Sequence, residues 1–206
     1  MDLLETLRWR YATKKFSGDS VSPDHIDMIA EAIRLAPSSI GAQPYHIIIA
    51  SGELKDKLIQ SSGQVDKIGC SHIFVFCSRI DYPQRAQKQL EITAETQGVS
   101  VESLAGFAKS LARISENKTL EQITVWAARQ AYIALGIGLI ACAELHIDAC
   151  PMEGFKPAEF HEILGLPEYM QPVVIMAVGH RDLEDPAQPE MRAKVRFSKG
   201  DLFEFK

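Results

Sequence analysis

The chain has 206 residues, of which 46% are hydrophobic, and it carries a formal net charge of −5 at pH 7. This length and apolar content suffice for a sizeable core in one domain, or in two small ones. The acidic balance argues against nucleic acid or an anionic membrane surface as the main partner.

The N-terminus and the cysteines bear on the compartment. Asp2 and Glu5 stand where a signal peptide carries Lys or Arg, and the longest uncharged apolar run, 131–143, is too short to span a bilayer. The four cysteines form no CxxC pair and the six histidines show no HxH or HExxH spacing, which favours buried free thiols over a disulfide framework or a metal site. We expect a soluble cytoplasmic protein without a membrane partner.

Two amphipathic helices are predicted near the N-terminus. Leu3, Leu4 and Leu7 share one helical face and give a short first helix. The sequence 22–24, Ser-Pro-Asp, then combines a hydroxyl cap, a first-turn proline and an acid at the positive end of the helix dipole. Apolar residues recur at helical spacing after it until Pro37 ends the pattern.

Buried strands are predicted at 46–50, 73–77 and 172–178, where β-branched and aromatic residues run without interruption. Residues 83–117 are mostly polar and helical, with a turn at Gly98 and Val99. The segment 120–145 reads as one long helix, apolar on nearly all sides after Arg129 and therefore buried. Few strands separated by helices predict an α+β or α/β layered domain with helices on both faces of a sheet.

The C-terminal segment 181–206 is loosely patterned and rich in proline and charge. Residues 201–205, Asp-Leu-Phe-Glu-Phe, alternate as a strand does, yet the segment has no obvious partner within its own chain. An arm that adds to the sheet of another subunit is one interpretation.

The sequence 150–155, Cys-Pro-Met-Glu-Gly-Phe, is the most informative stretch of the chain. We expect Pro151 and Gly154 to stop the long helix and to force the backbone into an open loop with outward N–H groups. Such donors beside an apolar wall suit a planar heterocycle with acceptor atoms at its edge.

Three other segments have a functional and a structural interpretation. Arg10 to Phe16 carries cations that can clamp a phosphate, or forms a solvated basic turn. Residues 36–45, with Pro, Ser and Gly at a helix exit, suit a polar ligand or simply join helix to strand. Lys194 and Arg196 lie on one side of an extended segment, where charge usually faces solvent.

Further signals are weaker. Gly136 and Gly138 are a close-packing device in a helix, since no third glycine or preceding strand makes them a dinucleotide fingerprint. Gln130 is either a satisfied core amide or a reader of a ligand edge. No Ser-His-Asp order, nucleophile elbow or Walker loop occurs, and nothing pairs Glu153 with Glu162, so in an enzyme a cofactor carries the chemistry.

Taken in order, these segments resemble the nitroreductase family of FMN-dependent NAD(P)H oxidoreductases, and most of all its oxygen-insensitive nitroreductase and dihydropteridine reductase branch. The resemblance spans almost the whole chain. The matching segments are Arg10–Lys14, Ala36–Ser39 with Gln43–Tyr45, Ser71–Phe76, Trp126 with Gln130, Pro151–Phe155 and Lys194–Arg196.

The resemblance implies one domain, 1–206, with a three-layer α/β/α sandwich of the α+β class around a mixed, mainly antiparallel sheet. It implies a homodimer with two tightly but non-covalently bound FMN molecules at the interface. The arm, 181–206, is then exchanged between subunits, and 83–120 is a helical lid or excursion.

The resemblance also assigns site residues. Lys14, Glu153 and Gly154 are the implied catalytic residues: Lys14 as the cation near the flavin pyrimidine edge, and the other two through a backbone N–H aimed at flavin N5. Ile40 and Phe107 are the implied substrate contacts. The remaining implied FMN contacts are the phosphate clamp Arg10, Tyr11, Ala12, Lys194 and Arg196, the closing loop Pro37, Ser38, Ser39 and Gly41, the pyrimidine-edge pair Gln64 and Lys67, and Gln130, Pro151 and Met152.

The activity that the resemblance implies is reduction of nitroaromatics, quinones or pterins by NAD(P)H in a ping-pong hydride transfer through FMN. A flavoprotein of the same fold with altered chemistry (dehalogenase, dehydrogenase or flavin-processing) is the alternative within enzymes, and a non-catalytic flavin-binding protein is the alternative outside them. The chain departs from the family pattern at Ala12, where serine is common, and at Ile40-Gly41, where a polar pair is common.

Overall fold

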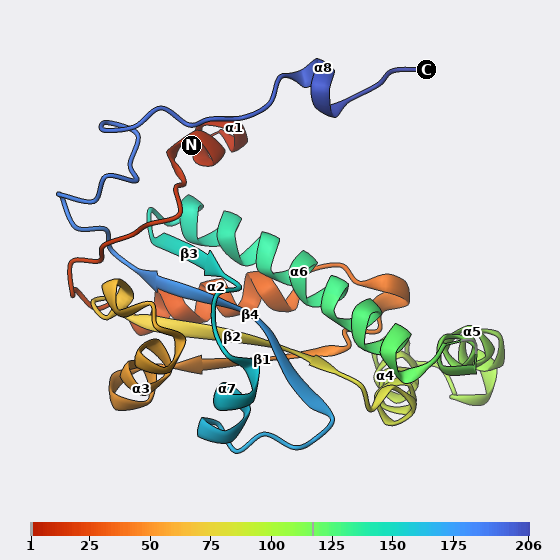
Figure 1. Ribbon diagram of the computed structural model, residues 1–206. Helices are drawn as coiled ribbons and strands as arrows, with labels where there is room; N and C mark the ends of the chain where they lie inside the picture. Colours follow the sequence, from red (N-terminus) through yellow and green to blue (C-terminus); the bar gives the residue numbers. More distant parts are fainter. Residues whose placement is uncertain (1, 117) are drawn as a thin grey trace.

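A computed structural model describes residues 2–116 and 118–206, and its centre is a four-stranded antiparallel sheet (Figure 1). The strand order is β1-β2-β4-β3. The predicted strands at 46–50, 73–77 and 172–178 are confirmed, and the two central strands are buried along most of their length. The bounds are Tyr45–Ala50 for β1, His72–Arg79 for β2, Asp148–Met152 for β3 and Met170–Gly179 for β4.

Helices cover both faces of the sheet, which confirms the three-layer α+β sandwich. Figure 1 shows α2 (Pro23–Arg34) and α6 (Leu120–Glu144) on one face, and α3 (Gly52–Ser62) and α7 (Pro157–Ile163) on the other. The remaining α-helices of the described residues are α1 (Leu3–Trp9), α4 (Tyr82–Gln97), α5 (Ala105–Glu116) and α8 (Lys199–Leu202).

The long helix α6 is only partly buried in the single chain. Its capping box at Thr119 starts it well before the apolar run at 131–143, so by length and composition the whole helix could cross a membrane. It instead packs on the sheet and on α2, as a core helix does. A Cβ at Gly138 would lie 3.0 Å from the Ile33 side chain, which confirms close packing there, whereas Gly136 faces open space.

The open loop predicted at 150–155 begins later than expected. Residues 148–152 form β3, which pairs with β4, so Pro151 lies within a strand and only Glu153 and Gly154 are outside it. Proline fits because β3 is an edge strand, where the missing N–H removes no ladder bond. The helix ends before this proline, at Glu144, and His146 turns the chain with φ = 53°.

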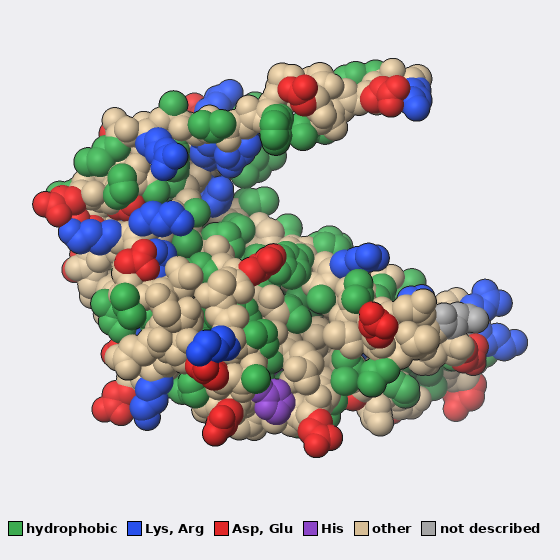
Figure 2. All heavy atoms as spheres, in the orientation of Figure 1, with side chains coloured by type: hydrophobic (Ala, Val, Ile, Leu, Met, Phe, Trp, Pro, Cys, Tyr) green, Lys and Arg blue, Asp and Glu red, His purple; other side chains and the backbone are tan. Residues whose placement is uncertain are grey.

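The C-terminal arm, residues 181–206, leaves the body and runs along an open groove (Figures 1 and 2). The strand predicted at 201–205 is wrong in the single chain, because Ser198 caps a short helix, α8, that includes Asp201 and Leu202. The arm exposes most of its apolar side chains, with Val195 80% and Phe205 95% exposed.

The first helix and the cysteines complete the comparison with the sequence. Helix α1 is confirmed, but Leu3, Leu4 and Leu7 are not its buried face, because α1 packs on α6 through Thr6 instead. All four cysteines are buried and free, as predicted.

Candidate functional site

Two segments at opposite ends of the chain line one cavity of about 260 Å³. The Tyr11 hydroxyl donates to the carbonyl of Arg192 at 2.5 Å, across 181 residues of sequence, and the Lys194 ammonium lies 4.6 Å from the Tyr11 ring centroid. The structure therefore joins the basic segment after α1 to the basic part of the arm. The lining residues are Arg10, Tyr11, Ala12, Lys14, Ala187, Arg192, Ala193, Lys194, Val195 and Arg196.

None of the described residues that line this cavity is acidic, and five of them are basic. Burial and the neighbouring Arg196 lower the pKa of Arg10. Burial, followed by Arg10 and Arg196, lowers the pKa of Lys194 to about 8. Cations that lower one another's pKa without a counter-charge suit the binding of an anion. Figure 2 shows basic side chains gathered where the arm leaves the body.

The ammonium of Lys194 is held in place by the protein backbone. It donates to the carbonyl of Leu7 at 2.5 Å and to that of Arg10. Since an ammonium has three donors, one remains for a ligand. The guanidinium of Arg10 donates to no residue that the structure describes, so its fork is available to a bidentate acceptor such as phosphate.

Two buried carboxylates that the sequence did not reveal shape the wall of the cavity. Asp185 accepts the backbone N–H of Lys14 at 2.7 Å and that of Lys15 at 3.2 Å. Asp148, at the start of β3, accepts the Thr13 hydroxyl at 3.2 Å and the backbone N–H of Arg181 at 2.9 Å. Their partners in the segment 13–15 lie 135 to 171 residues away in the sequence, so no local sequence pattern predicts the role of either carboxylate.

Lys14 and Lys67, the two lysines implied to stand near a flavin pyrimidine, differ sharply. The Lys14 side chain is exposed and lines the cavity. Lys67 is buried, and its ammonium donates to the Lys14 carbonyl at 2.8 Å and pairs with Asp66. The Lys14 side chain is thus accessible to a ligand, whereas the Lys67 ammonium stabilises the Lys14 backbone through its hydrogen bond to the carbonyl.

The turn after β3 adjoins this region and offers hydrogen-bond donors. Gln64 Nε2 donates to the carbonyl of Gly154 at 3.3 Å, and Phe155 N donates to the carbonyl of Glu153 at 2.9 Å. The backbone N–H groups of Glu153 and Gly154 donate to no residue in 2–116 or 118–206. The two donors expected after Pro151 are therefore unpaired within the described residues, and Gln64, whose carbonyl accepts the Lys67 N–H at 2.8 Å, links the turn to the Lys67–Lys14 contact.

The loop 37–43 is separate from the cavity and is strained. Ile40 has φ = 47° and Gln43 has φ = 43°, a left-handed backbone that costs a β-branched residue most. Gln89 Nε2 donates to the Ile40 carbonyl at 2.7 Å, and the Ser39 N–H donates to Gln130 Oε1 at 2.8 Å. Strain held by specific side chains is typical of a functional loop.

Other implied site residues lie apart from the cavity in the single chain. Pro37, Ser38 and Gly41 belong to the strained loop. The Gln130 amide is satisfied within the protein, since Nε2 donates to the Trp126 carbonyl at 3.1 Å. Phe107 lies on α5, at the end of the molecule occupied by α4 (Figure 1).

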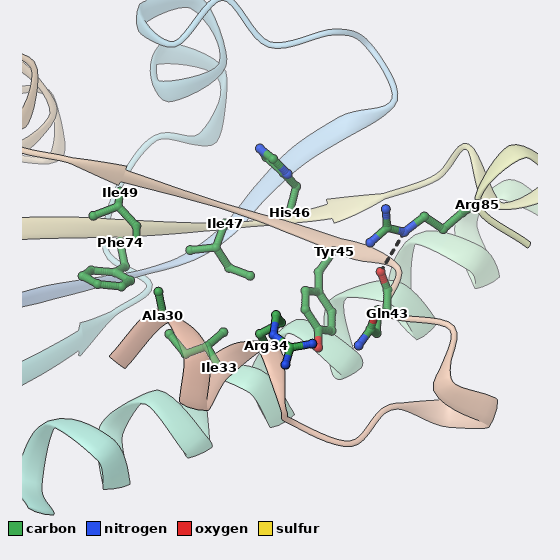
Figure 3. A pocket seen from close by; sticks show the side chains of 10 residues that line it. All are labelled: Ala30, Ile33, Arg34, Gln43, Tyr45, His46, Ile47, Ile49, Phe74 and Arg85. Atoms are coloured by element: carbon green, nitrogen blue, oxygen red, sulfur yellow. Dashed lines mark hydrogen bonds between the residues drawn. The ribbon is translucent and has the colours of Figure 1, made fainter. Parts of the chain in front are cut away.

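A second cavity of about 260 Å³ lies between α2 and the edge strand β1. Figure 3 shows Tyr45 and Ile47 of β1 pointing toward Ile33 and Arg34 of α2, with Arg85 donating to the Gln43 carbonyl. Its lining is mostly apolar and shares no residue with the basic cavity.

Comparison with known proteins identifies the family. The family model described as "Nitroreductase family" matches residues 7–180. A Staphylococcus saprophyticus protein that bears the name "Putative NAD(P)H nitroreductase" is 30% identical over 98% of this chain and 96% of its own length. The oxygen-insensitive NAD(P)H nitroreductase of Salmonella typhimurium is 28% identical over 90% of this chain and 91% of its own.

Solved structures share the fold of this chain. A structure from Exiguobacterium sibiricum solved in complex with FMN superposes with a TM-score of 0.85 over 100% of this chain and 98% of that one, at 17% identity. The match to the family model alone covers most of the chain. The basic cavity and the Glu153–Gly154 turn lie largely on the segments that carry the resemblance. The chain belongs to the nitroreductase family.

Proposed function

We propose that the chain is an oxidoreductase that holds FMN non-covalently and uses NAD(P)H to reduce nitroaromatics, quinones or related electron-poor acceptors. The observation that carries the proposal is the basic cavity, in which Arg10, Lys194 and Arg196 meet without a carboxylate beside a turn with two spare N–H donors. The names of the relatives and the FMN-bound fold neighbour support the same reaction.

The residues present fit FMN at both ends of that cofactor. A phosphate dianion supplies the charge that the cluster lacks, and the Arg10 fork and the remaining Lys194 donor match its oxygens. The N–H groups of Glu153 and Gly154 suit the acceptor edge of a flavin ring, with Pro151 and Met152 beneath it. Lys14, the exposed cation between these two regions, suits the pyrimidine edge.

FMN supplies the redox chemistry when bound, since its N5 accepts hydride from NAD(P)H and delivers it to the acceptor in a ping-pong sequence. The chain contributes electrostatics and orientation. Lys14 stabilises negative charge at the pyrimidine edge, and the backbone donors of Glu153 and Gly154 fix the ring without a side-chain acid. This division explains why the sequence shows no catalytic triad.

The second part of the proposal is a homodimer whose partner completes each site. In the single chain the strained loop 37–43 and Phe107 lie apart from the basic cavity. The family resemblance implies that such a loop closes the cofactor site of the partner, so we assign Ser38, Ser39 and Gly41 to the site of the other subunit, with Ile40 and Phe107 as substrate contacts. The exposed face of α6, which includes Val125 and Ile133, provides an apolar surface for that contact.

The arm offers a way to hold the two copies together. Of the two sheet edges, β3 is covered by the chain itself through the Ala12–Ala149 bridge, while β1 has no strand beside it among the described residues. The arm exposes Phe203 and Phe205 in an extended tail. We place that tail on β1 of the partner, with the aromatic rings against the cavity of Figure 3.

An absorbance spectrum of the purified protein tests the cofactor, followed by anaerobic titration with NADH and NADPH. We expect a flavin spectrum that bleaches on titration and recovers when menadione or nitrofurazone is added. Protein that holds no FMN, and takes up none when it is supplied, would contradict the proposal. Bound FMN that neither nicotinamide bleaches would contradict the NAD(P)H step alone.

Sedimentation analysis tests the dimer. Phe203→Ser together with Phe205→Ser should weaken the association, because the change removes the aromatic anchors and leaves the basic cavity intact. Leu183→Ser is the matched control, since Leu183 is an equally exposed apolar residue near the start of the arm. A wild-type chain that sediments as a monomer would refute the exchange.

A further inference from the structure

The carboxylate of Glu153 is tied to helix α6. The Tyr132 hydroxyl donates to Glu153 Oε1 at 2.5 Å and approaches the Val173 carbonyl at 3.4 Å. A hydroxyl has one hydrogen, so the shorter contact, to a carboxylate, is the bond it makes. Tyr132 lies within the apolar part of α6, one turn after Arg129, and is 38% exposed.

Both carbonyls of the Glu153–Gly154 turn and one oxygen of its carboxylate accept hydrogen bonds from the protein. The carbonyl of Glu153 accepts from Phe155, the carbonyl of Gly154 accepts from Gln64, and Glu153 Oε1 accepts from Tyr132. The two backbone N–H groups of the turn, and Glu153 Oε2, have no partner among the described residues. Tyr132 thus holds the acidic side chain of a turn whose backbone has only N–H donors to offer.

The tyrosine stays a donor across the physiological range. Burial, and then its bond to Glu153, raises the pKa of Tyr132 to about 12. Because the hydroxyl remains protonated well above neutral pH, the bond to the carboxylate persists wherever the protein works.

We propose that Tyr132 is a positioning residue, whose hydroxyl holds the Glu153 carboxylate at α6 through Oε1 so that the turn meets the flavin with its backbone N–H donors. This inference rests on the proposed function. A carboxylate without this hydrogen bond would repel the negative charge of reduced FMN, and it would compete with the flavin for the N–H groups of Glu153 and Gly154. The bond to Tyr132 therefore favours the reduced form of the cofactor.

The two-electron midpoint potential of bound FMN tests this role in the purified holoenzyme. Tyr132→Phe removes one oxygen and keeps the ring. A charge-assisted hydrogen bond contributes enough for about a tenfold loss in the preference for reduced over oxidised FMN. For a two-electron couple that loss is a potential about 30 mV more negative.

The same substitution in a Glu153→Gln background separates charge from packing. With the carboxylate gone, Tyr132→Phe should leave the potential unchanged. Tyr169→Phe is the matched control, because Tyr169 is 37% exposed against 38% for Tyr132 and its ring contacts Arg79 rather than the turn. It should leave the potential at the wild-type value.

The outcomes distinguish this inference from the proposed function. A protein that binds no FMN refutes the proposed function. FMN bound at an unchanged potential in Tyr132→Phe refutes the positioning role alone. An equal shift with and without the Glu153 carboxylate also refutes it, since Tyr132 then acts through packing. A shift that requires the carboxylate supports it.

Discussion

Two groups of cations lie on the same part of the molecule and have opposite surroundings. In the first, the guanidinium of Arg181 lies 2.6 Å from Asp148, and the ammonium of Lys15 lies 2.8 Å from Glu184. In the second, Arg10 and Lys194 face Arg196 and no acid in the lining of the basic cavity. The two groups are joined by the short segment 10–15.

The pKa directions separate the groups in the same way. Hydrogen bonds that the Lys15 ammonium donates to Glu184 and Asp182 raise the pKa of Lys15, as pairing does. Burial and like charges lower the pKa of Lys194 and of Arg10. Pairing with an acid favours the charged form of a cation, whereas neighbouring cations without an acid disfavour it until an anion binds. Similar residue types thus serve structure in one place and, in our proposal, binding in the other.

The largest effect is expected from breaking the buried pair. Asp148→Ala leaves the Arg181 guanidinium and the Thr13 hydroxyl without their acceptor, and should lower the free energy of unfolding by about 3–5 kcal/mol. Chemical denaturation of the FMN-free protein measures it. Glu184→Ala is the control, since it removes an exposed partner of Lys15 and should change little. Equal stability of both variants would show that the buried Arg181–Asp148 pair stabilises the fold no more than the exposed Lys15–Glu184 pair.

The second effect concerns the cavity. Arg10→Ala should weaken FMN binding about 10- to 100-fold, the contribution of charge-assisted hydrogen bonds to a phosphate. The FMN-free variant should be no less stable than wild type, because the change relieves repulsion with Arg196. Fluorescence titration and thermal unfolding measure the two quantities.

Arg8→Ala serves as the control for Arg10→Ala. Arg8 is an exposed cation two residues earlier, in the last turn of α1 and outside the cavity lining. It should leave FMN affinity unchanged. An Arg10→Ala variant that loses stability but binds FMN normally would place Arg10 with the paired group.

The third effect is a dependence on pH. The pKa of Lys194 is about 8 in the folded chain, against an ordinary value of 10.5. Between these values the unfolded chain binds more protons, so the free energy of unfolding of the FMN-free protein should rise with pH. FMN affinity should fall in the same interval, because Lys194 loses its charge while the phosphate stays a dianion. Lys194→Arg should flatten both profiles.

The sequence predicts the strands and most helices because their signals are local. The three long apolar runs coincide with the strands β1, β2 and β4, and the Ser22 cap directly precedes the helix α2 that it starts. The strand β3 was missed because Pro151 argues against a strand and only its place at the sheet edge permits it. The strand predicted at 201–205 is absent from the single chain, because an alternation of apolar residues does not specify the strand with which it pairs.

The residues of the candidate site also divide into those that the sequence indicated and those whose roles depend on distant contacts. Arg10, Lys194 and Arg196 were found through a resemblance that orders them along the chain, and the structure brings them to one cavity. Asp148, Asp185 and Tyr132 were not found, since each acts on residues far away in sequence. A lone tyrosine within the apolar part of a helix was the only available sign of Tyr132.

The smallest expected effect comes from adding a donor to the group of cations without acids. Ala12 lines the basic cavity at the point where relatives commonly carry serine, and Ala12→Ser adds one hydroxyl beside the proposed phosphate position. The hydroxyl gives up a hydrogen bond to water when it binds the phosphate, so we expect a net gain of about 0.5–1.5 kcal/mol and a rise in FMN affinity of about 2- to 10-fold. Ala193→Ser adds the same atom to the lining from the arm and is the control for position. A gain at Ala12 alone would show that the anion lies against the wall formed by Arg10–Lys14. A gain at Ala193 alone would place it against the arm, and weaker binding of Ala12→Ser would mean that the ligand already fills the space beside Ala12.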